Sequence, residues 1–272
     1  MPHSNFETAI DAIISGDVAA LANLLRCWPA LVHDRSPQGA TLLHYIAANG
    51  VEQERQRTPP NAVEIARLLL DAGAEVDARA PMYGGQATTM SMLVSSVHPA
   101  RAGLQSALVD LLVDYGASVE FESPLLTALA FGYLEAAEAL VRRGARVDTL
   151  PAAAGLGRRE LFLELLPWAS ATDRHRAIAL AAQHGRTELV AELLDAGEDP
   201  NRLNPPRFHG HSTPLHQAVA GGHFDTVRLL VERGARTDIE DTFHHGTALG
   251  WAKHLGQVEI ANYLATITGA LA

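Results

Sequence analysis

The chain repeats one sequence pattern along most of its length: paired apolar residues, then a glycine, then a short polar exit. Five clear copies are ARLLLDAGAEVD (66–77), VDLLVDYGASVE (109–120), AEALVRRGARVD (137–148), VAELLDAGEDPN (190–201) and VRLLVERGARTD (227–238). Degenerate copies at 21–32, 161–172 and 260–271 bring the number of units to about eight. Repetition on this scale predicts a solenoid, in which each unit packs mainly against its neighbours.

Each of these endings follows a second apolar-periodic segment, and a short link containing glycine joins the two. The linking glycines are Gly16, Gly50, Gly132, Gly157, Gly185, Gly222 and Gly256. Glycine readily ends a helix in the left-handed conformation, so the chain can reverse direction at once. The pattern therefore predicts pairs of helices, and neither helix of a pair can bury its apolar face unless the pairs stack.

The segment STPLHQAVAGGHFDTVRLLVERGARTD (212–238) resembles a nearly complete ankyrin repeat. In that family Thr213 and Pro214 would open the first helix, where the missing N–H of proline costs nothing. The segment ATLLHYIAANG (40–50) repeats the feature through His44. The resemblance covers essentially the whole chain and implies an all-α repeat solenoid: an ankyrin array of about eight helix-turn-helix units with short β-hairpin fingers. It also implies that His44, His216 and His223 are structural residues that hydrogen-bond within the protein.

The spacing of the units departs from the family pattern. Ankyrin units recur at about 33 residues, whereas the stop glycines Gly73, Gly116 and Gly144 are 43 and 28 residues apart. Two units carry insertions near 51–61 and 97–105, and their proline and polar residues predict loops. The fifth unit, 147–162, has too little chain for a full finger. We expect a single ankyrin-repeat domain over 1–272, with atypical capping units near 6–35 and 247–272.

Charge and cysteine content limit the possible partners and compartment. A net charge of -10 and a pI near 5.7 argue against a general nucleic-acid or membrane binder and favour a mildly cationic or amphipathic partner segment. The single cysteine, Cys27, excludes an intramolecular disulfide framework and fits a reducing compartment. It follows an apolar helix beside Trp28, so we expect it to pack in the core. With no apolar run long enough to span a membrane, the chain is expected to be cytoplasmic.

Histidines gather near the end of the chain. Aligned on 212–238, His209, His211, His244 and His245 fall in two successive fingers, while His184 and His254 fall at the ends of first helices. Three interpretations stay open. Imidazoles could bind a transition metal, but no H-E-x-x-H motif or cysteine set supports this, and Glu240 and Asp241 have no ligand spacing, so no metal or cofactor is predicted. Alternatively, the cluster is an anion or polar-ligand surface walled by Phe243 and Trp251, or consists of exposed loop residues that contact a partner.

A second unusual stretch is MYGGQATTMSMLVSSVHPARAG (82–103). Tyr83 would lie on a finger, Ser95 and Ser96 at a helix end, and His98 with Arg101 on the adjoining loop. Together they could line a pocket wall, with Arg101 available for a carboxylate or phosphate. The serines could equally cap and solvate the helix, with Arg101 in solvent. Nucleophilic catalysis by Ser95 or Ser96 is not favoured, because residues so close to His98 at a helix end rarely have the required geometry.

Two functions from different classes remain. The preferred one is a non-enzymatic interaction module that binds a protein or peptide partner on its concave face. The alternative is a small-molecule-binding or catalytic ankyrin protein with a pocket lined by Tyr83, His98, Arg101 and the concave histidines. A deep, closed pocket would favour the alternative, and an open groove would favour a protein partner. The ligand- or partner-binding candidates are Asn49, Tyr83, Ser95, Ser96, His98, Arg101, Phe131, Gln183, His184, His209, His211, His244, His245, Trp251 and His254.

Overall fold

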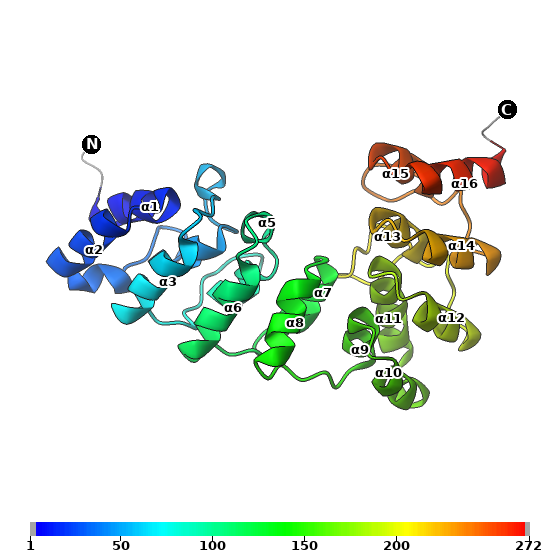
Figure 1. Cartoon of the computed structure of the whole chain (residues 1–272), viewed down its shortest axis with the longest axis horizontal. Helices are drawn as coiled ribbons and strands as arrows, with labels where there is room; N and C mark the ends of the chain where they lie inside the picture. Colours follow the sequence, from blue (N-terminus) through cyan, green and yellow to red (C-terminus); the bar gives the residue numbers. More distant parts are fainter. Residues whose placement is uncertain (1–3, 270–272) are drawn as a thin grey trace. The chain divides into compact units, whose positions relative to one another are not determined.

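The structure, a computed structural model, describes residues 4–269, and helical pairs account for most of them (Figure 1). Eight such pairs follow one another along the chain, which confirms the predicted all-helical repeat architecture. The chain divides into two compact units, Met1–Arg146 and Val147–Ala272, with four pairs in each. Among the described residues, no helix is both long and apolar enough to cross a bilayer.

The first unit contains two rows of helices. The first members of its pairs are α1 (Asn5–Ser15), the 3-10 helix η2 (Leu42–Ala47), α4 (Thr89–Leu93) and α7 (Pro124–Ala130). The second members are α2 (Val18–Cys27), α3 (Ala62–Asp71), α6 (Gln105–Asp114) and α8 (Leu134–Arg142). Each row packs in chain order, and buried residues such as Ile10, Leu43, Leu69 and Leu108 lie between the helices. A short 3-10 helix, η1 (Pro29–His33), completes the first repeat.

The two insertions contain more regular structure than the predicted loops. The first includes the 3-10 turn η3 (Gln53–Arg55), and Arg55 forms an ion pair with Glu7 of α1. The second begins with a short helix, α5 (Val97–Arg101), which corrects the expectation of an irregular loop over 97–105. Pro99 does not prevent this helix because it lies in the first turn, where a backbone N–H has no helical partner.

The second unit repeats the arrangement. Its first members are α9 (Leu150–Leu156), α11 (Ala171–Gln183), α13 (Pro214–Ala220) and α15 (Ala248–His254). Its second members are α10 (Arg159–Leu165), α12 (Thr187–Asp195), α14 (Phe224–Glu232) and α16 (Val258–Thr268), and the 3-10 turn η4 (Leu166–Trp168) follows α10. The last three residues of the predicted carboxyl-terminal cap, 270–272, lie outside the described residues.

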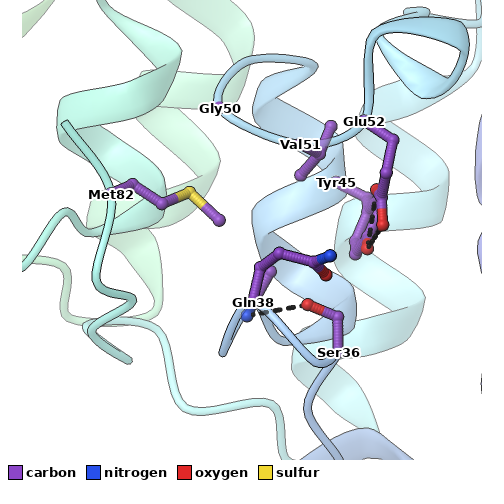
Figure 2. Close-up of a pocket in the computed structure, with 8 residues that line it drawn as sticks. Ser36, Gln38, Tyr45, Gly50, Val51, Glu52 and Met82 are labelled. Carbon is purple, nitrogen blue, oxygen red and sulfur yellow. Dashed lines mark hydrogen bonds between the residues drawn. The ribbon is translucent and has the colours of Figure 1, made fainter.

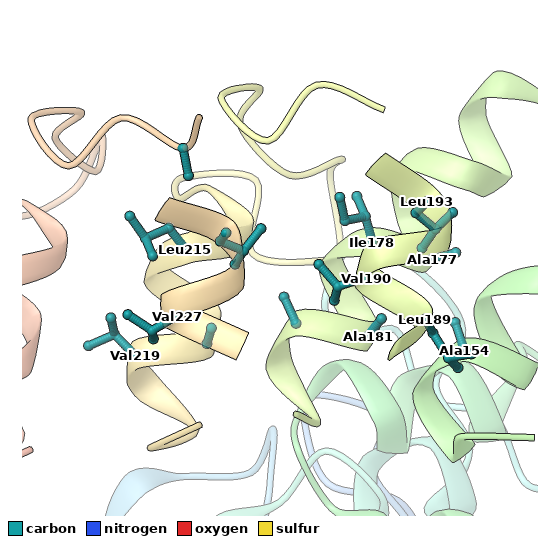
Figure 3. Packing of buried hydrophobic residues seen from close by; sticks show 14 of the residues in the cluster. Ala154, Ala177, Ile178, Ala181, Leu189, Val190, Leu193, Leu215, Val219 and Val227 are labelled. Atoms are coloured by element: carbon teal, nitrogen blue, oxygen red, sulfur yellow. The ribbon is translucent and has the colours of Figure 1, made fainter. Parts of the chain in front are cut away.

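Small and branched apolar side chains form one continuous core in the second unit (Figure 3). Ala177, Ile178 and Ala181 of α11 are buried, as are Leu215 and Val219 of α13. The alanines let the first members of neighbouring pairs approach closely, and α11 packs on both α9 and α13. Stacking therefore buries faces that a single pair would leave exposed.

The connections between helices largely agree with the predictions from the sequence. All seven predicted linking glycines have left-handed φ values, between 65° and 81°. The predicted fingers are turns rather than strands: in the described residues only single antiparallel bridges form, between Ala80 and Ala87 and between Glu240 and Thr247. The link 143–149 contains no bridge, as expected for a unit with too little chain for a finger, and the two compact units divide within it. One continuous domain across this link stays a prediction.

Cys27 corrects one expectation from the sequence. It is the last residue of α2, and it is exposed rather than packed in the core. The buried face of α2 consists of Leu21, Leu24 and Leu25. Position 27 lies off this face, and the chain leaves the helix at Trp28, so neither side chain reaches the core.

Candidate functional site

Tyr83 lies at the tip of the finger between α3 and α4, with 69% of its surface exposed. Its φ of 54° is unusual for a residue with a side chain. Its hydroxyl donates a hydrogen bond to Asn49 Oδ1, and Asn49 Nδ2 donates to Ser95 Oγ at 2.9 Å and to the Met92 carbonyl at 3.1 Å. Three of the predicted residues, Asn49, Tyr83 and Ser95, therefore form one network that anchors an exposed aromatic ring.

The Tyr83 ring also packs on the backbone at Gly50. A Cβ atom at Gly50 would lie 2.9 Å from Met82 Sδ and 3.1 Å from Tyr83 Cε2. The link between η2 and α3 thus needs glycine for two reasons: its positive φ and the close approach of this finger.

Among residues 4–269, this network has no hydrogen bond to the side chains of the other predicted residues nearby, Ser96, His98 and Arg101. Ser96 is buried and donates to the Ala48 carbonyl at 3.2 Å, which corrects the expectation of an accessible side chain. His98 is half-buried in α5, and Arg101 is exposed at the end of α5. Ser95 donates to the Ser91 and Met92 carbonyls, as a serine near the end of a helix commonly does.

A small cavity lies beside Gly50 and Met82 (Figure 2). Its volume is about 20 Å³, which suits a single water molecule, whereas pockets for small-molecule ligands are roughly 300–1,000 Å³. Tyr45 lines it and donates to Glu52 at 3.1 Å; burial, together with the charge of Glu52, raises the pKa of Tyr45 to about 12. Neither His98 nor Arg101 lines this cavity.

Phe131, at the end of α7, is exposed and stacks on Tyr133, with ring centroids 6.4 Å apart and planes 16° from parallel. Burial raises the pKa of Tyr133, and the charge of Arg101 opposes this shift, which places the guanidinium near the pair. The sequence singled out Phe131 but not Tyr133.

The structure confirms the three structural histidines. His44 Nδ1 pairs with Thr41 Oγ1 at 2.8 Å, and its Nε2 lies 3.3 Å from the Ala87 carbonyl in the next finger. His216 repeats this with Thr213 and the Gly246 carbonyl, and His223 Nε2 lies 3.0 Å from the Gln183 carbonyl. Burial lowers the pKa of His44 to about 4 and also lowers that of His216, so both rings are neutral at physiological pH.

One buried carboxylate organises the last finger. Asp241 accepts hydrogen bonds from the backbone N–H groups of Phe243, His244 and Gly246 at 2.8–2.9 Å, and from Trp251 Nε1 at 2.9 Å. Burial acts to raise the pKa of Asp241, but these four donors outweigh it and hold the pKa far below its usual range. The charge is thus compensated within the protein, and Trp251 is fixed in position.

His211, Phe243 and Trp251 come together from two fingers and α15, and we call them the His–Phe–Trp surface. The His211 and Phe243 rings stack with centroids 4.6 Å apart and planes 10° from parallel. Trp251 lies 6.0 Å from His211, and 72% of Phe243 is exposed. A backbone hydrogen bond of 2.9 Å from Thr242 N to the His211 carbonyl joins the two fingers. Burial, followed by the charge of His209, lowers the pKa of His211.

The remaining predicted residues differ in exposure and in their contacts. His209 is half-buried, with its ring edge-on to His211 at 5.9 Å. His244 and His245 are exposed, and His245 Nδ1 lies 3.8 Å from Glu240 Oε2. His254 is exposed at the end of α15. Gln183 and His184 are half-buried at the end of α11, two repeats earlier.

No group of three or more histidine, cysteine or carboxylate side chains within residues 4–269 is placed to hold a metal ion. Asp241, a carboxylate in the same finger as His244 and His245, already uses its oxygens as acceptors for N–H donors. From the sequence, Asp241 was considered only as a metal ligand, without suitable spacing, and its structural role was not predicted. An aspartate followed by turn residues, here in DTFHHG (241–246), was the available signal, because such side chains accept bonds from the backbone two and three residues on.

Comparison with known proteins agrees with this architecture. A model of three ankyrin repeats matches residues 178–270, and a single-repeat model matches residues 38–81. The chain is 27% identical over 215 residues to the ankyrin repeat and KH domain-containing protein mask-1 of Caenorhabditis elegans; the match covers 74% of this chain and only 8% of that protein. It is 32% identical over 123 residues to cyclin-dependent kinase 4 inhibitor B of Mus musculus, covering 34% of this chain and 92% of that protein.

The crystal structure of the human ASB11 ankyrin repeat domain aligns with 93% of this chain and 96% of that chain, at 19% identity and a TM-score of 0.46. The repeat pairs, the threonine–histidine caps and the matched family models together show that the chain belongs to the ankyrin-repeat family, whose domains are typically protein-interaction modules.

Proposed function

We propose that the chain is a non-enzymatic interaction module that binds a protein or peptide partner through its finger tips and the ends of its first helices, which form the concave face in ankyrin arrays. One observation carries the proposal: finger tips hold aromatic side chains that are both exposed and anchored. Tyr83 is fixed by Asn49, and Phe243 is stacked on His211. Aromatic residues held in this way lose little conformational entropy on binding and are frequent hot spots of interfaces.

The name of one relative, cyclin-dependent kinase 4 inhibitor B, describes a protein that acts on another protein, which supports the same class of function here. The partner's identity is open. The net charge of -10 supports a protein rather than a nucleic acid or an anionic membrane. An exposed free cysteine supports a reducing compartment, and we place the protein in the cytoplasm.

The small-molecule alternative has less support. Its pocket would need Tyr83, His98 and Arg101 around one cavity. The Tyr83 hydroxyl is instead engaged by Asn49, His98 and Arg101 lie on α5, and the nearby cavity suits only one water molecule. We therefore propose no reaction and no cofactor.

Affinity capture with matched variants tests the interaction role. The Tyr83→Ala, Phe243→Ala double variant removes both anchored rings, whereas Trp168→Ala removes a ring that is 88% exposed but follows the second-row helix α10. Proteins bound by the parent and by Trp168→Ala should be lost with the double variant. A partner recovered in this way, purified and titrated by calorimetry, should bind the double variant about 30-fold or more weakly.

An unchanged set of bound proteins with the double variant would overturn the proposal. A thermal-shift screen with metabolites on the parent and on a Tyr83→Ala, Arg101→Ala variant addresses the alternative. A metabolite that stabilises only the parent would support the small-molecule function instead.

A further inference from the structure

An open groove lies between the second-row helices α6 and α8, which pack side by side in the first unit (Figure 1), and we call it the α6–α8 groove. Its volume is about 390 Å³, which is large enough for a long side chain. The residues that line it are Ser106, Leu134, Glu135, Glu138 and Arg142. None of them belongs to a finger, so this groove is a different surface from the aromatic finger tips.

The groove is acidic when both helices are counted completely. The helices α6 and α8, with the cap residue that follows α8, contain four carboxylates and two arginines. Both arginines already pair with the aspartates of α6, in the pairs Arg142–Asp110, at 3.5 Å, and Arg143–Asp114. The other two carboxylates, Glu135 and Glu138, both line the groove. Arg101, whose charge acts on Tyr133 just before α8, does not line it, and with Arg101 counted the carboxylates still outnumber the arginines.

The second unit shows which side chain fills the equivalent place. Arg159, the first residue of α10, extends to α12, where its Nε lies 3.3 Å from Glu188 Oε2 and its Nη2 lies 3.7 Å from Glu192 Oε1. A guanidinium has several donors in one plane, so it can meet two carboxylates at once. In this pair of helices the chain itself supplies the arginine.

In the first unit a serine takes the place of that arginine. Ser106 lies ten residues before the stop glycine of its helix, as do the first residues of α8 and α12. Glu135 is the second residue of α8, just as Glu188 is the second residue of α12. The Ser106 hydroxyl donates to the Glu135 carbonyl at 3.2 Å, and the Glu135 carboxylate has no ion pair among residues 4–269. The glutamate is thus kept, and its arginine is not.

We infer that the α6–α8 groove binds an arginine side chain of a partner protein. The guanidinium meets Glu135 and Glu138, and the aliphatic part of the side chain packs on Leu134, which is half-buried and lies one helical turn before Glu138. Arginine fits better than lysine because only a guanidinium can bond two carboxylates as Arg159 does. This surface is additional to the finger tips of the proposed function. Its charge agrees with the cationic partner that the net charge of -10 favours.

Peptide selection with a matched depletion step tests the inference. A displayed library of random peptides is first depleted on the Ser106→Arg variant, in which the chain supplies the guanidinium, and is then selected on the full-length parent. Recovered peptides are labelled and titrated by fluorescence anisotropy against the parent, Ser106→Arg, the Glu135→Gln, Glu138→Gln double variant and Glu188→Gln. The last is the control, because Glu188 is already paired with Arg159. Circular dichroism checks the helix content of each variant.

We expect the recovered peptides to contain arginine. The double variant should weaken their binding about fivefold, the scale of exposed ion pairs, and added salt should weaken it as well. Ser106→Arg should weaken it about tenfold or more, because the new side chain fills the groove and repels the guanidinium of the peptide. Replacing the arginine of the peptide by lysine should also weaken binding, whereas Glu188→Gln should leave it unchanged.

No peptide recovered after the depletion, or recovered peptides without arginine, would overturn the inference. Binding that the Glu135→Gln, Glu138→Gln double variant leaves unchanged would also overturn it. If Ser106→Arg does not fold, this double variant replaces it in the depletion step, so the test still decides.

The Tyr83→Ala, Phe243→Ala double variant separates this inference from the proposed function. It should bind the recovered peptides as tightly as the parent does. Peptides that it fails to bind would belong to the finger tips, so the interaction function would stand and the groove assignment would fail. If the peptides behave as expected but affinity capture finds no finger-dependent partner, the groove assignment stands and the proposed function fails.

Discussion

Asp241 has four N–H donors directed at its carboxylate, so an amide at this position would place an NH₂ group against donors. Asp241→Asn should lower the free energy of unfolding by about 1–3 kcal/mol, the cost of an unsatisfied buried polar group. Asp238→Asn is the matched control: Asp238 is exposed and paired with Arg236 at 2.8 Å, and because solvent screens this pair its loss should cost clearly less than the loss of Asp241. Urea denaturation measures both values. Equal losses would show that the Asp241 hydrogen bonds do not stabilise the fold.

His44 makes stability depend on pH. Its pKa is lowered to about 4 mainly by burial, so between that value and the unfolded value of 6.5 the unfolded chain binds more protons than the native one. Stability is therefore complete above about pH 6.5 and falls as the pH decreases toward about 4. His44 alone should account for about 2 kcal/mol of the loss between about pH 7.5 and about pH 5.

Denaturation at these two pH values checks the effect. The loss should shrink in His44→Asn and persist in His254→Gln, which changes an exposed histidine. An undiminished loss in His44→Asn would mean that other groups with lowered pKa values, such as His175, His211 and His216, cause it.

At the scale of elements, the link inside one repeat contacts the finger that follows it. A substitution at Gly50 tests how much this contact stabilises the protein. Gly50→Ala must move Met82 and Tyr83, whereas Gly73→Ala has a positive φ but nothing within 4 Å of the added Cβ. Both variants lose stability from backbone strain, and Gly50→Ala should lose about 1 kcal/mol or more beyond Gly73→Ala. Thermal melts give the difference; melts that coincide would show that the finger yields without cost.

Contacts between residues that are close in the sequence could be predicted. Contacts between residues that only the folded chain brings together could not. The threonine–histidine caps are three residues apart, so Thr213 and His216 could be recognised from sequence. In the third repeat Ser91 takes the histidine's place and forms the capping box with Thr88. Asp241 acquires its role because Trp251 returns to it ten residues later. The network of Tyr83 with Asn49 spans thirty-four residues, and the sequence named both without pairing them.

At the scale of the whole molecule, a cavity in the core should destabilise the repeats around it more than distant ones. The reason is that stability in a repeat array comes from each repeat and its nearest neighbours. Leu215, fully buried in α13, packs in the core of the second unit (Figure 3). Leu215→Ala should cost about 2–5 kcal/mol. Hydrogen exchange should show the greatest loss of protection in α11, α13 and α15, and little in α1 and α2. A uniform loss along the chain would mean that all eight repeats unfold as one cooperative unit.

The position of Cys27 has a practical consequence. It is the one thiol in the sequence, and it is exposed at the end of a second-row helix, outside the fingers of its own unit. Maleimide chemistry would therefore attach the native chain to a sensor surface in a single orientation, without mutagenesis. A coating made in this way presents every molecule identically, so measured association rates would reflect one population of immobilised protein.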